Sequence, residues 1–223
     1  MRSYGQYCPV AKGAELLGDR WTLLIAREML FGPLRFTELE RGLPGISRSI
    51  LAQRLRQLRR FGIIEAVGAS GYRFTAAGNA LRPVIQAIGD WVAQWIMGDP
   101  SPAELDPELL VLWISRHVHR EALPRGRTVV AFEFLDQPTR HLWLVLERDD
   151  VSVCLHHPGL PVQVTVQAAA RDLYRVYMGR ATLGGEQHAG RVTLEGTRSM
   201  TRAFPTWMAW SNFAASSHLA AAG

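Results

Sequence analysis

The chain has 223 residues, of which 48% are hydrophobic and 20% are charged, a composition typical of globular proteins. Its length exceeds that of a typical domain, so we expect two domains, each with its own core. No apolar run approaches the roughly 18 residues of a membrane helix, and the first ten residues lack the apolar stretch of a signal peptide. Two cysteines are too few for a disulfide framework or a zinc site, so we expect a cytoplasmic protein with no membrane partner.

Positive charge is concentrated in the first half of the chain. Residues 1–98 hold 13 Lys and Arg against 7 Asp and Glu, a net charge of +6, whereas residues 99–223 hold 12 against 13, a net charge of −1. This asymmetry indicates that the first half meets a polyanion. The stretch MGDPSPAELDP lies between two periodic regions, so we predict domains at 1–98 and 107–223 joined by a linker at 99–106.

Three short helices are predicted at the start of the chain. Pro9 opens the first and Gly18 ends it. Asp19 is placed to cap the second, which Gly32 ends. A third spans about residues 36–43, and the LPGI sequence at its end has the composition of a turn.

A basic helix follows Ser47, its predicted N-cap. Leu51, Leu55 and Leu58 are spaced i, i+4 and i+7, so they form one apolar stripe that faces a core. The same helix carries five arginines and no acidic residue between positions 48 and 60. Its remaining faces are therefore strongly positive.

Beyond the basic helix the pattern changes period. The runs IIEAV and YRFT predict two short strands joined as a hairpin. Thr75 is then placed to cap a long helix, in which Pro83 predicts a kink or a local break. The complete order of elements is that of a winged helix-turn-helix.

The residues CPVAKGAELLGDRWT, RFTEL, LPGIS and YRFTAAG closely resemble the HxlR family of bacterial transcriptional regulators, a branch of the MarR-like winged-helix proteins. The resemblance covers about residues 7–96. It implies a regulator that binds double-stranded operator DNA and dimerises through its first and last helices.

The basic helix has the chemistry to read DNA. An α-helix fits the major groove, and the donors of Arg and Gln match acceptors on guanine and adenine, so we predict base and phosphate contacts from this helix and backbone or minor-groove contacts from its flanks. The alternative is a solvated arginine face on a structural helix. The predicted contacts are Arg35, Thr37, Ser47, Arg48, Ser49, Gln53, Arg54, Arg56, Gln57, Tyr72 and Arg73.

Operators are usually bound by symmetric dimers, so a self-association surface is expected. Apolar residues of the second and last helices would form it, and the alternative is that they are buried against the second domain. The predicted dimer residues are Trp21, Leu24, Trp91, Val92, Trp95 and Ile96.

Cys8 stands before Pro9 at a helix N-terminus, where the helix dipole favours a thiolate. Some members of the resembled family sense oxidants or electrophiles with a cysteine near this place. A thiol switch is therefore a second hypothesis, beside that of a small buried thiol. Cys154 is predicted to lie in a strand as a core residue.

The histidines do not form a predicted metal site. His117 and His119 point to different sides of a predicted helix, and no carboxylate stands at ligand spacing from His156 and His157. No Gly-rich phosphate loop, nucleophile elbow or paired-carboxylate pattern occurs. We therefore expect no metal, no cofactor, no catalytic residue and no enzymatic activity.

The second half predicts an α+β domain. An amphipathic helix from Pro107 precedes four strand-like runs, TVVAFEFL, HLWLVLER, VSVCLHHP and PVQVTVQA. A helix, a fifth strand and a closing helix interrupted by Pro205 follow. We expect helices on one face of a sheet.

This half, about residues 107–213, is similar to sterol-carrier-protein-like domains, on the residues VTVQAAARDLYRVYMGRATLGGEQHAGRVTLEGTRSMTRAF. The fold of that family is a mostly antiparallel sheet whose helical cover leaves an apolar tunnel, which implies an apolar small-molecule ligand. Arg175 or Arg180 would meet an acidic head group, and the alternative for each aromatic residue is plain core. The candidate ligand contacts are Trp113, Phe132, Phe134, Trp143, Tyr174, Tyr177, Met178 and Trp207.

The main hypothesis is thus a homodimeric DNA-binding transcriptional regulator, a repressor, whose C-terminal domain senses an apolar small molecule. One alternative is a hydrophobic-ligand or lipid carrier that uses the winged helix for dimerisation. Another is a thiol-based redox-sensing regulator acting through Cys8.

Overall fold

The computed structural model describes residues 3–68, 71–136 and 140–216. Within these ranges, helices and two separate sheets account for the regular structure. No helix in them is long and apolar enough to span a membrane.

The chain divides into two compact units, Met1–Gly89 and Asp90–Gly223. The division falls within helix α6 (Arg82–Trp95), upstream of the segment 99–106 that the sequence indicates as a linker. Each unit has its own hydrophobic core.

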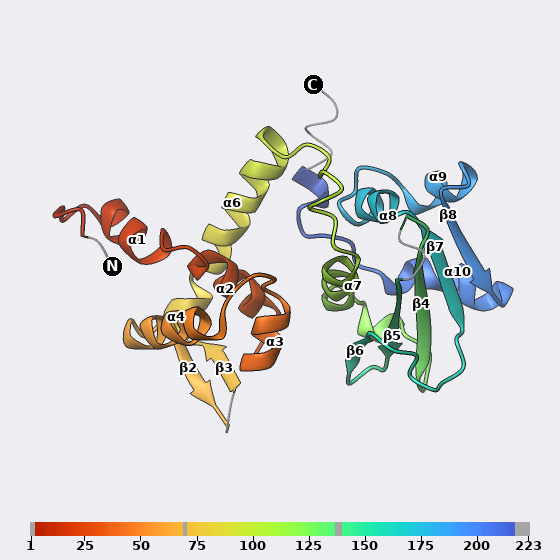
Figure 1. The fold of residues 1–223 in the computed structure, drawn as a ribbon, viewed down its shortest axis with the longest axis horizontal. Helices are drawn as coiled ribbons and strands as arrows, with labels where there is room; N and C mark the ends of the chain where they lie inside the picture. Colours follow the sequence, from red (N-terminus) through yellow and green to blue (C-terminus); the bar gives the residue numbers. More distant parts are fainter. Residues whose placement is uncertain (1–2, 69–70, 137–139, 217–223) are drawn as a thin grey trace. The chain divides into compact units, whose positions relative to one another are not determined.

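The N-terminal unit is a winged helix-turn-helix. Helices α3 and α4 are joined by a turn, and the hairpin of β2 and β3 follows directly (Figure 1). A two-residue strand, β1, completes an antiparallel sheet in the order β1-β3-β2. The elements before α6 are α1 (Pro9–Leu17), α2 (Thr22–Glu28), the 3-10 helix η1 (Met29–Phe31), β1 (Leu34–Arg35), α3 (Phe36–Arg41), α4 (Arg48–Arg60), β2 (Ile64–Val67), β3 (Gly71–Phe74) and α5 (Ala76–Asn79).

Helix α4 has the start and the apolar stripe that its sequence predicts. The Ser47 hydroxyl accepts a hydrogen bond from the backbone N–H of Ile50 at 3.2 Å. Leu51, Leu55 and Leu58 are at most 1% exposed and belong to the core of the unit. Burying three leucines fixes which way the helix is rotated.

The start of the second helix differs from the prediction. Helix α2 begins at Thr22, and its N-cap is Trp21, in a left-handed conformation with φ of 81° and no side-chain cap. The predicted cap, Asp19, bonds through its carboxylate to residues of α4 instead. A charge-assisted contact with an arginine competes successfully for this carboxylate.

The predicted long last helix is two helices. Thr75 caps the short α5 by accepting from the N–H of Gly78 at 3.2 Å, and α6 begins after a turn at Ala80 and Leu81. Pro83 lies in the first turn of α6 and has no N–H with which to continue the helical hydrogen bonds of α5, which explains the break between the two helices. A Cβ at Gly78 would lie 2.2 Å from the Ile63 carbonyl oxygen, so this packing requires glycine.

The C-terminal unit is α+β. Its five-stranded sheet has the order β6-β5-β4-β7-β8, in which β4 and β7 are parallel and the other neighbours are antiparallel. Its elements are α7 (Pro107–Arg116), the 3-10 helix η2 (Arg120–Ala122), β4 (Thr128–Phe134), β5 (His141–Leu146), β6 (Val151–Cys154), β7 (Val164–Ala168), α8 (Ala170–Tyr177), α9 (Leu183–His188), β8 (Val192–Gly196) and α10 (Arg198–Trp207).

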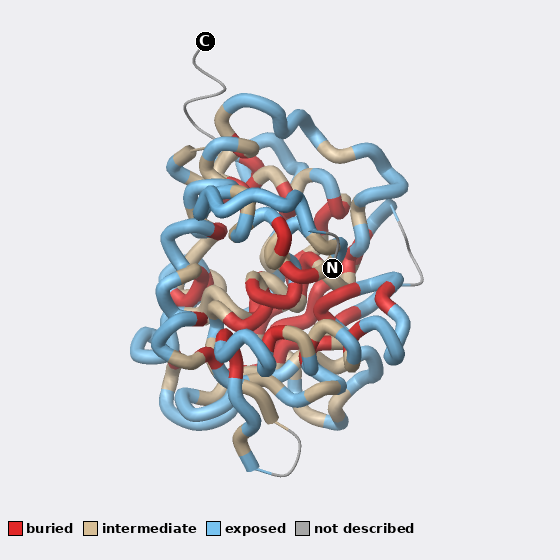
Figure 2. The backbone as a smooth tube through the Cα atoms, turned by 90° about the vertical axis from the view of Figure 1, so that its left-hand side faces the viewer, coloured by how far each residue is buried: buried red, intermediate tan, exposed pale blue. Residues whose placement is uncertain are grey.

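One face of this sheet shares a core with α7, α8 and α10. Alternate strand residues such as Val130, Phe132, Leu144 and Val166 are at most 1% exposed and lie together in register on that face. Figure 2 colours the backbone by burial and shows the buried stretches in red. The prediction of helices against one face of a sheet agrees with this core.

Three details of the second half differ from the prediction. Helix α9 is absent from the predicted elements because LGGEQH contains two glycines, but Thr182 caps it. The closing helix continues through Pro205, whose missing N–H removes one hydrogen bond near the helix end. His117 and His119 lie outside the helix, because α7 ends at Arg116.

Candidate nucleic-acid interface

The solvent face of α4 lies opposite its leucine stripe. Ser49, Gln53, Arg56 and Arg60 are all exposed and follow one another at i, i+4, i+7 and i+11. We call these four residues the groove face of α4. A helix of this kind presents a straight row of donors to whatever packs against it.

Arg54 and Gln57 lie off the groove face, on a flank of the helix. The Arg54 Nη1 atom is 2.6 Å from the Asp19 Oδ2 atom, and the Gln57 Nε2 atom is 3.2 Å from the same oxygen. The side chains of Arg54 and Asp19 are only 18% and 27% exposed. This group ties the middle of α4 to the turn between α1 and α2; we call it the Asp19 clamp.

Arg48 and Ser47 stand at the start of α4. Arg48 donates to Glu40 of α3 at 2.8 Å and lies over the Phe36 ring, yet its side chain remains 68% exposed. The Ser47 hydroxyl is 3.0 Å from that of Ser49 and already serves as the helix cap. Both residues remain available to a phosphate at the helix N-terminus.

The predicted flanking contacts lie on exposed or partly exposed positions. Arg35 and Thr37 are exposed at the start of α3, where the Arg35 N–H bonds to the Glu38 carboxylate at 2.5 Å. In the hairpin, Arg73 is exposed and pairs with Glu65 at 2.7 Å, whereas Tyr72 is half-buried against the core. All eleven predicted DNA contacts remain predictions.

Arg59 and Arg60 are not among the contacts predicted from the sequence. With Arg56, these exposed arginines line a shallow hollow of about 470 Å³ beside β2. The helical spacing from Gln53 and Arg56 was the signal that places Arg60 on the groove face.

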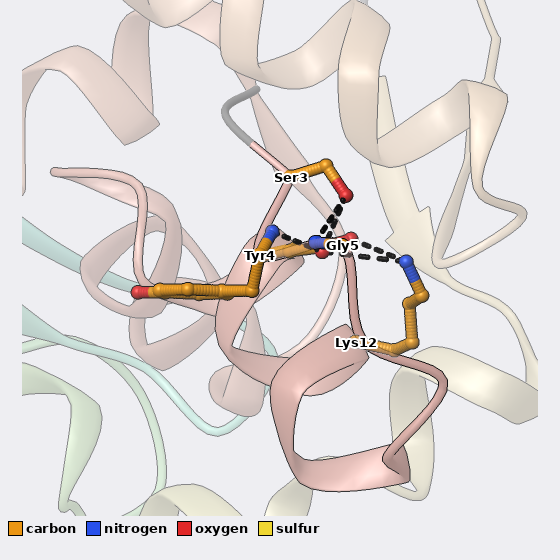
Figure 3. A network of polar contacts seen from close by, with 5 residues as sticks. Ser3, Tyr4, Gly5 and Lys12 are labelled. Atoms are coloured by element: carbon orange, nitrogen blue, oxygen red, sulfur yellow. Dashed lines mark hydrogen bonds and ion pairs between the residues drawn. The ribbon is translucent and has the colours of Figure 1, made fainter.

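A polar network anchors the N-terminal arm that carries Cys8 (Figure 3). The Glu15 carboxylate, 4% exposed, accepts from Ser3 Oγ at 2.9 Å, from Tyr4 N–H at 2.7 Å and from Lys12 Nζ at 3.0 Å. The Tyr4 N–H above all, with Lys12 and Ser3, lowers the pKa of Glu15. Cys8 itself is exposed at the N-cap of α1, contrary to a buried thiol.

Helix α6 exposes an apolar row. Val84, Ile88, Trp91 and Trp95 recur at i, i+4, i+7 and i+11 and are 41%, 42%, 56% and 69% exposed. Of the other predicted dimer residues, Leu24 and Ile96 are exposed, Val92 is half-buried, and Trp21 packs partly against the core of its own unit. An exposed apolar row at helical spacing is typical of an association surface.

Most predicted ligand contacts lie in the core of the C-terminal unit. Trp113 is half-buried and stacks on Tyr177, and Trp143 lies on the opposite face of the sheet beside His141 and His157. The buried members are Phe132, Phe134, Tyr174, Tyr177, Met178 and Trp207.

Buried polar atoms without a hydrogen-bond partner in this unit include the Tyr174 hydroxyl and the Arg175 Nε atom, within the described residues. The Tyr174 hydroxyl is buried and makes no hydrogen bond within the described residues, and burial raises the pKa of the phenol. Burial also shifts the pKa of His117, which it lowers because it disfavours the charged imidazolium. The His117 Nδ1 atom is 2.8 Å from the Trp113 carbonyl oxygen. Within the described ranges, no three His, Cys, Asp or Glu side chains gather as a metal site.

Comparison with known proteins places the similarity in the winged-helix part. The model of the HxlR-like helix-turn-helix family matches residues 16–100. The uncharacterised HTH-type transcriptional regulator YvaP of Bacillus subtilis is 35% identical over 103 residues, which cover 43% of this chain and 94% of YvaP. The HTH-type transcriptional regulator YodB of the same organism is 36% identical, with 40% of this chain and 85% of YodB covered.

Similarity to solved structures is limited. A quinone-bound YodB is 37% identical over 40% of this chain and 99% of its own, with a TM-score of 0.38. The sec-alkylsulfatase Pisa1 from Pseudomonas is 15% identical over 49% of this chain and 17% of its own, with a TM-score of 0.40. At these TM-scores neither structure supports an inference about this chain.

The Asp19 clamp predicts a stability difference. Replacing Asp19 with Ala leaves the partly buried Arg54 guanidinium without its anion, so D19A is expected to lower the free energy of unfolding by about 1–3 kcal/mol. E40A, which removes the partner of the exposed Arg48, should cost less than about 1 kcal/mol. Chemical denaturation of both variants measures this, and equal losses would show that Asp19 does not clamp α4.

Proposed function

Because the chain belongs to the HxlR-like helix-turn-helix family, we propose that it is a homodimeric transcriptional regulator, a repressor, that binds operator DNA through α4. The observation that carries the proposal is the groove face, where Gln53 and Arg56 are exposed directly opposite three buried leucines. The helix is thereby held by its apolar side and offers its donors outward. The proposal includes no catalysis.

The groove face has the donors that base edges require. Gln53 matches the acceptor and donor of adenine, and the Arg56 guanidinium matches the two acceptors of guanine. Arg48 and the α4 N-terminus, one turn earlier, suit a phosphate. Arg54 and Gln57 hold the helix in position and do not read bases, because the Asp19 clamp keeps both side chains on the flank of the helix.

Dimerisation through α6 supports operator recognition. One α4 covers too few base pairs for specificity, whereas a symmetric pair reads two half-sites about one helical turn apart. The exposed row of Val84, Ile88, Trp91 and Trp95 has the spacing of a helix-packing seam. A bound dimer represses by occupying DNA that transcription needs.

The C-terminal unit is proposed to sense an apolar small molecule, which is what the resemblance of its sequence to sterol-carrier-protein-like domains implies. The unpartnered Tyr174 hydroxyl supports this, since a ligand with an acceptor group would satisfy it. Arg180, 12% exposed, bonds to Asp99 at 3.0 Å and to the Met97 carbonyl, two residues after α6 ends. A ligand beside Tyr174 thus acts close to the segment that leaves α6, and a coupling of about 1–3 kcal/mol would suffice for regulation.

A second candidate function is a thiol switch at Cys8. The supporting observation is the exposed thiol at the α1 N-cap, on an arm that Glu15 holds in place. Oxidation of Cys8 would alter the arm and, through α1, the dimer.

Base recognition by the groove face gives a first expectation. Q53A and R56A should each weaken binding to a selected duplex by about 5- to 150-fold, the equivalent of 1–3 kcal/mol, and should relax its sequence preference. Q57A, on the flank of the same helix, is the matched control and should change affinity less. Mobility-shift titrations measure all three, and wild-type affinity in both Q53A and R56A would remove the groove face from its role.

Dimerisation through α6 gives a second expectation. The double variant W91E/W95E places two charges in the apolar row, so it should sediment as a monomer under conditions where the wild type is a dimer. L155E, which adds a charge at another exposed apolar position in the C-terminal unit, should remain dimeric. A dimeric W91E/W95E protein in analytical ultracentrifugation contradicts the α6 interface.

Ligand sensing is tested by native mass spectrometry of the purified full chain. We expect an added mass of an apolar small molecule, with lower occupancy in Y174F because the hydroxyl is its proposed polar contact. I114V, a change in the same core at a residue that is not a candidate ligand contact, is the control for packing. No added mass in any preparation, including one incubated with mixed cellular lipids, contradicts the sensing role.

The thiol switch is tested with diamide. Treatment should change the DNA affinity of the wild type and of C154S, and it should leave C8S unchanged because that variant lacks the exposed thiol. Equal responses of C8S and the wild type, or no response in either, rule out Cys8 as the sensor.

A further inference from the structure

A hollow beside the groove face has an excess of positive charge. Arg56, Arg59 and Arg60 of α4 line it from one side, and Ile64, Glu65 and Ala66 of β2 line it from the other. All three arginine side chains are exposed, and none of these side chains makes a hydrogen bond or an ion pair with the described part of the chain.

The acidic residue of this hollow does not neutralise the arginines. Glu65 lines it, but its carboxylate accepts from Arg73 of β3 at 2.7 Å. The hollow therefore keeps an excess of positive charge, because its one carboxylate is paired with Arg73, and like charges repel one another. A bound anion would remove this repulsion.

The helix dipole explains only part of the arrangement. Basic residues in the last turn of a helix interact favourably with its negative end, which accounts for Arg59 and Arg60. Arg56 lies one turn earlier, and the dipole does not explain why the three side chains and a strand enclose a hollow. Since that end of the helix repels anions, an anion here must be held by guanidinium groups.

We propose that this hollow binds a phosphate of the DNA backbone, held by Arg59 and Arg60 between α4 and the wing strand β2. The assignment rests on the proposed function, because the groove face brings DNA to this end of the helix. Guanidinium groups bind phosphate oxygens in a bidentate way, and the hollow is open enough for a strand to pass.

This phosphate site divides the work along α4. Within the groove face, Gln53 and Arg56 discriminate bases, whereas Arg60, its last member, joins Arg59 in setting the register and depth of the helix without reading sequence. Removing the phosphate site should therefore weaken binding to all duplexes alike. Removing the base-reading side chains should change which duplex is preferred.

The test is fluorescence anisotropy with the full chain, a selected duplex and its scrambled form, between about 50 and 200 mM salt. R59A/R60A should bind both duplexes more weakly with their affinity ratio unchanged. Raising the salt over this range should weaken DNA binding by the variant less than binding by the wild type. The difference should be about threefold for each phosphate contact that the variant has lost. R202A removes an exposed arginine of α10 and should keep the wild-type salt dependence. R59K/R60K, which keeps the charges, should keep it as well.

The possible results distinguish a failure of the phosphate assignment from a failure of the proposed DNA-binding function. Absence of salt-dependent binding by the wild type defeats the proposed function itself. Two results for R59A/R60A would overturn only the phosphate assignment, provided that the wild type binds DNA in a salt-dependent way. One is a salt dependence equal to that of the wild type, and the other is a changed ratio of its affinities for the selected and scrambled duplexes. Calorimetric titration of inorganic phosphate without DNA should give no saturable binding; binding that R59A/R60A abolishes would make a free anion the occupant and overturn the assignment to DNA.

Discussion

The burial of Leu51, Leu55 and Leu58 is the constraint on which the proposed DNA-binding surface depends. Three leucines in one stripe fix the rotation of α4 about its axis, and that rotation decides which side chains reach solvent. Gln53 and Arg56 face outward for this reason alone. A one-residue shift of the stripe would turn the helix by about 100° and expose a different set of donors.

Local pattern predicted much of this unit, and contacts distant in sequence explain what it missed. The Ser47 cap, the leucine stripe and the hairpin follow from residues within a few positions of one another. The position of Arg54 could not be predicted, because Asp19 lies 35 residues away and gives up its predicted capping role to bind it. The hollow at Arg59 likewise needs β2 to be placed beside α4.

The C-terminal unit shows the same division. Alternation predicted its strands, yet no local pattern distinguishes an aromatic residue in a packed core from one that lines a cavity. Phe132 and Trp207 are 1% exposed among other apolar side chains, whereas the Tyr174 hydroxyl is buried without a partner. This orphaned atom, close to the charges of Arg180 and Asp99, is the feature of the unit that most favours a ligand.

The central claim is that two α4 helices of a dimer enter successive major grooves on one side of a duplex. Hydroxyl-radical footprinting of the full chain, on a duplex selected from a random-sequence pool, tests it most directly. Two protected patches are expected, with centres about 10 base pairs apart, or a multiple of this, on the same face of the DNA. A single patch, or uniform protection without a preferred position, would contradict it.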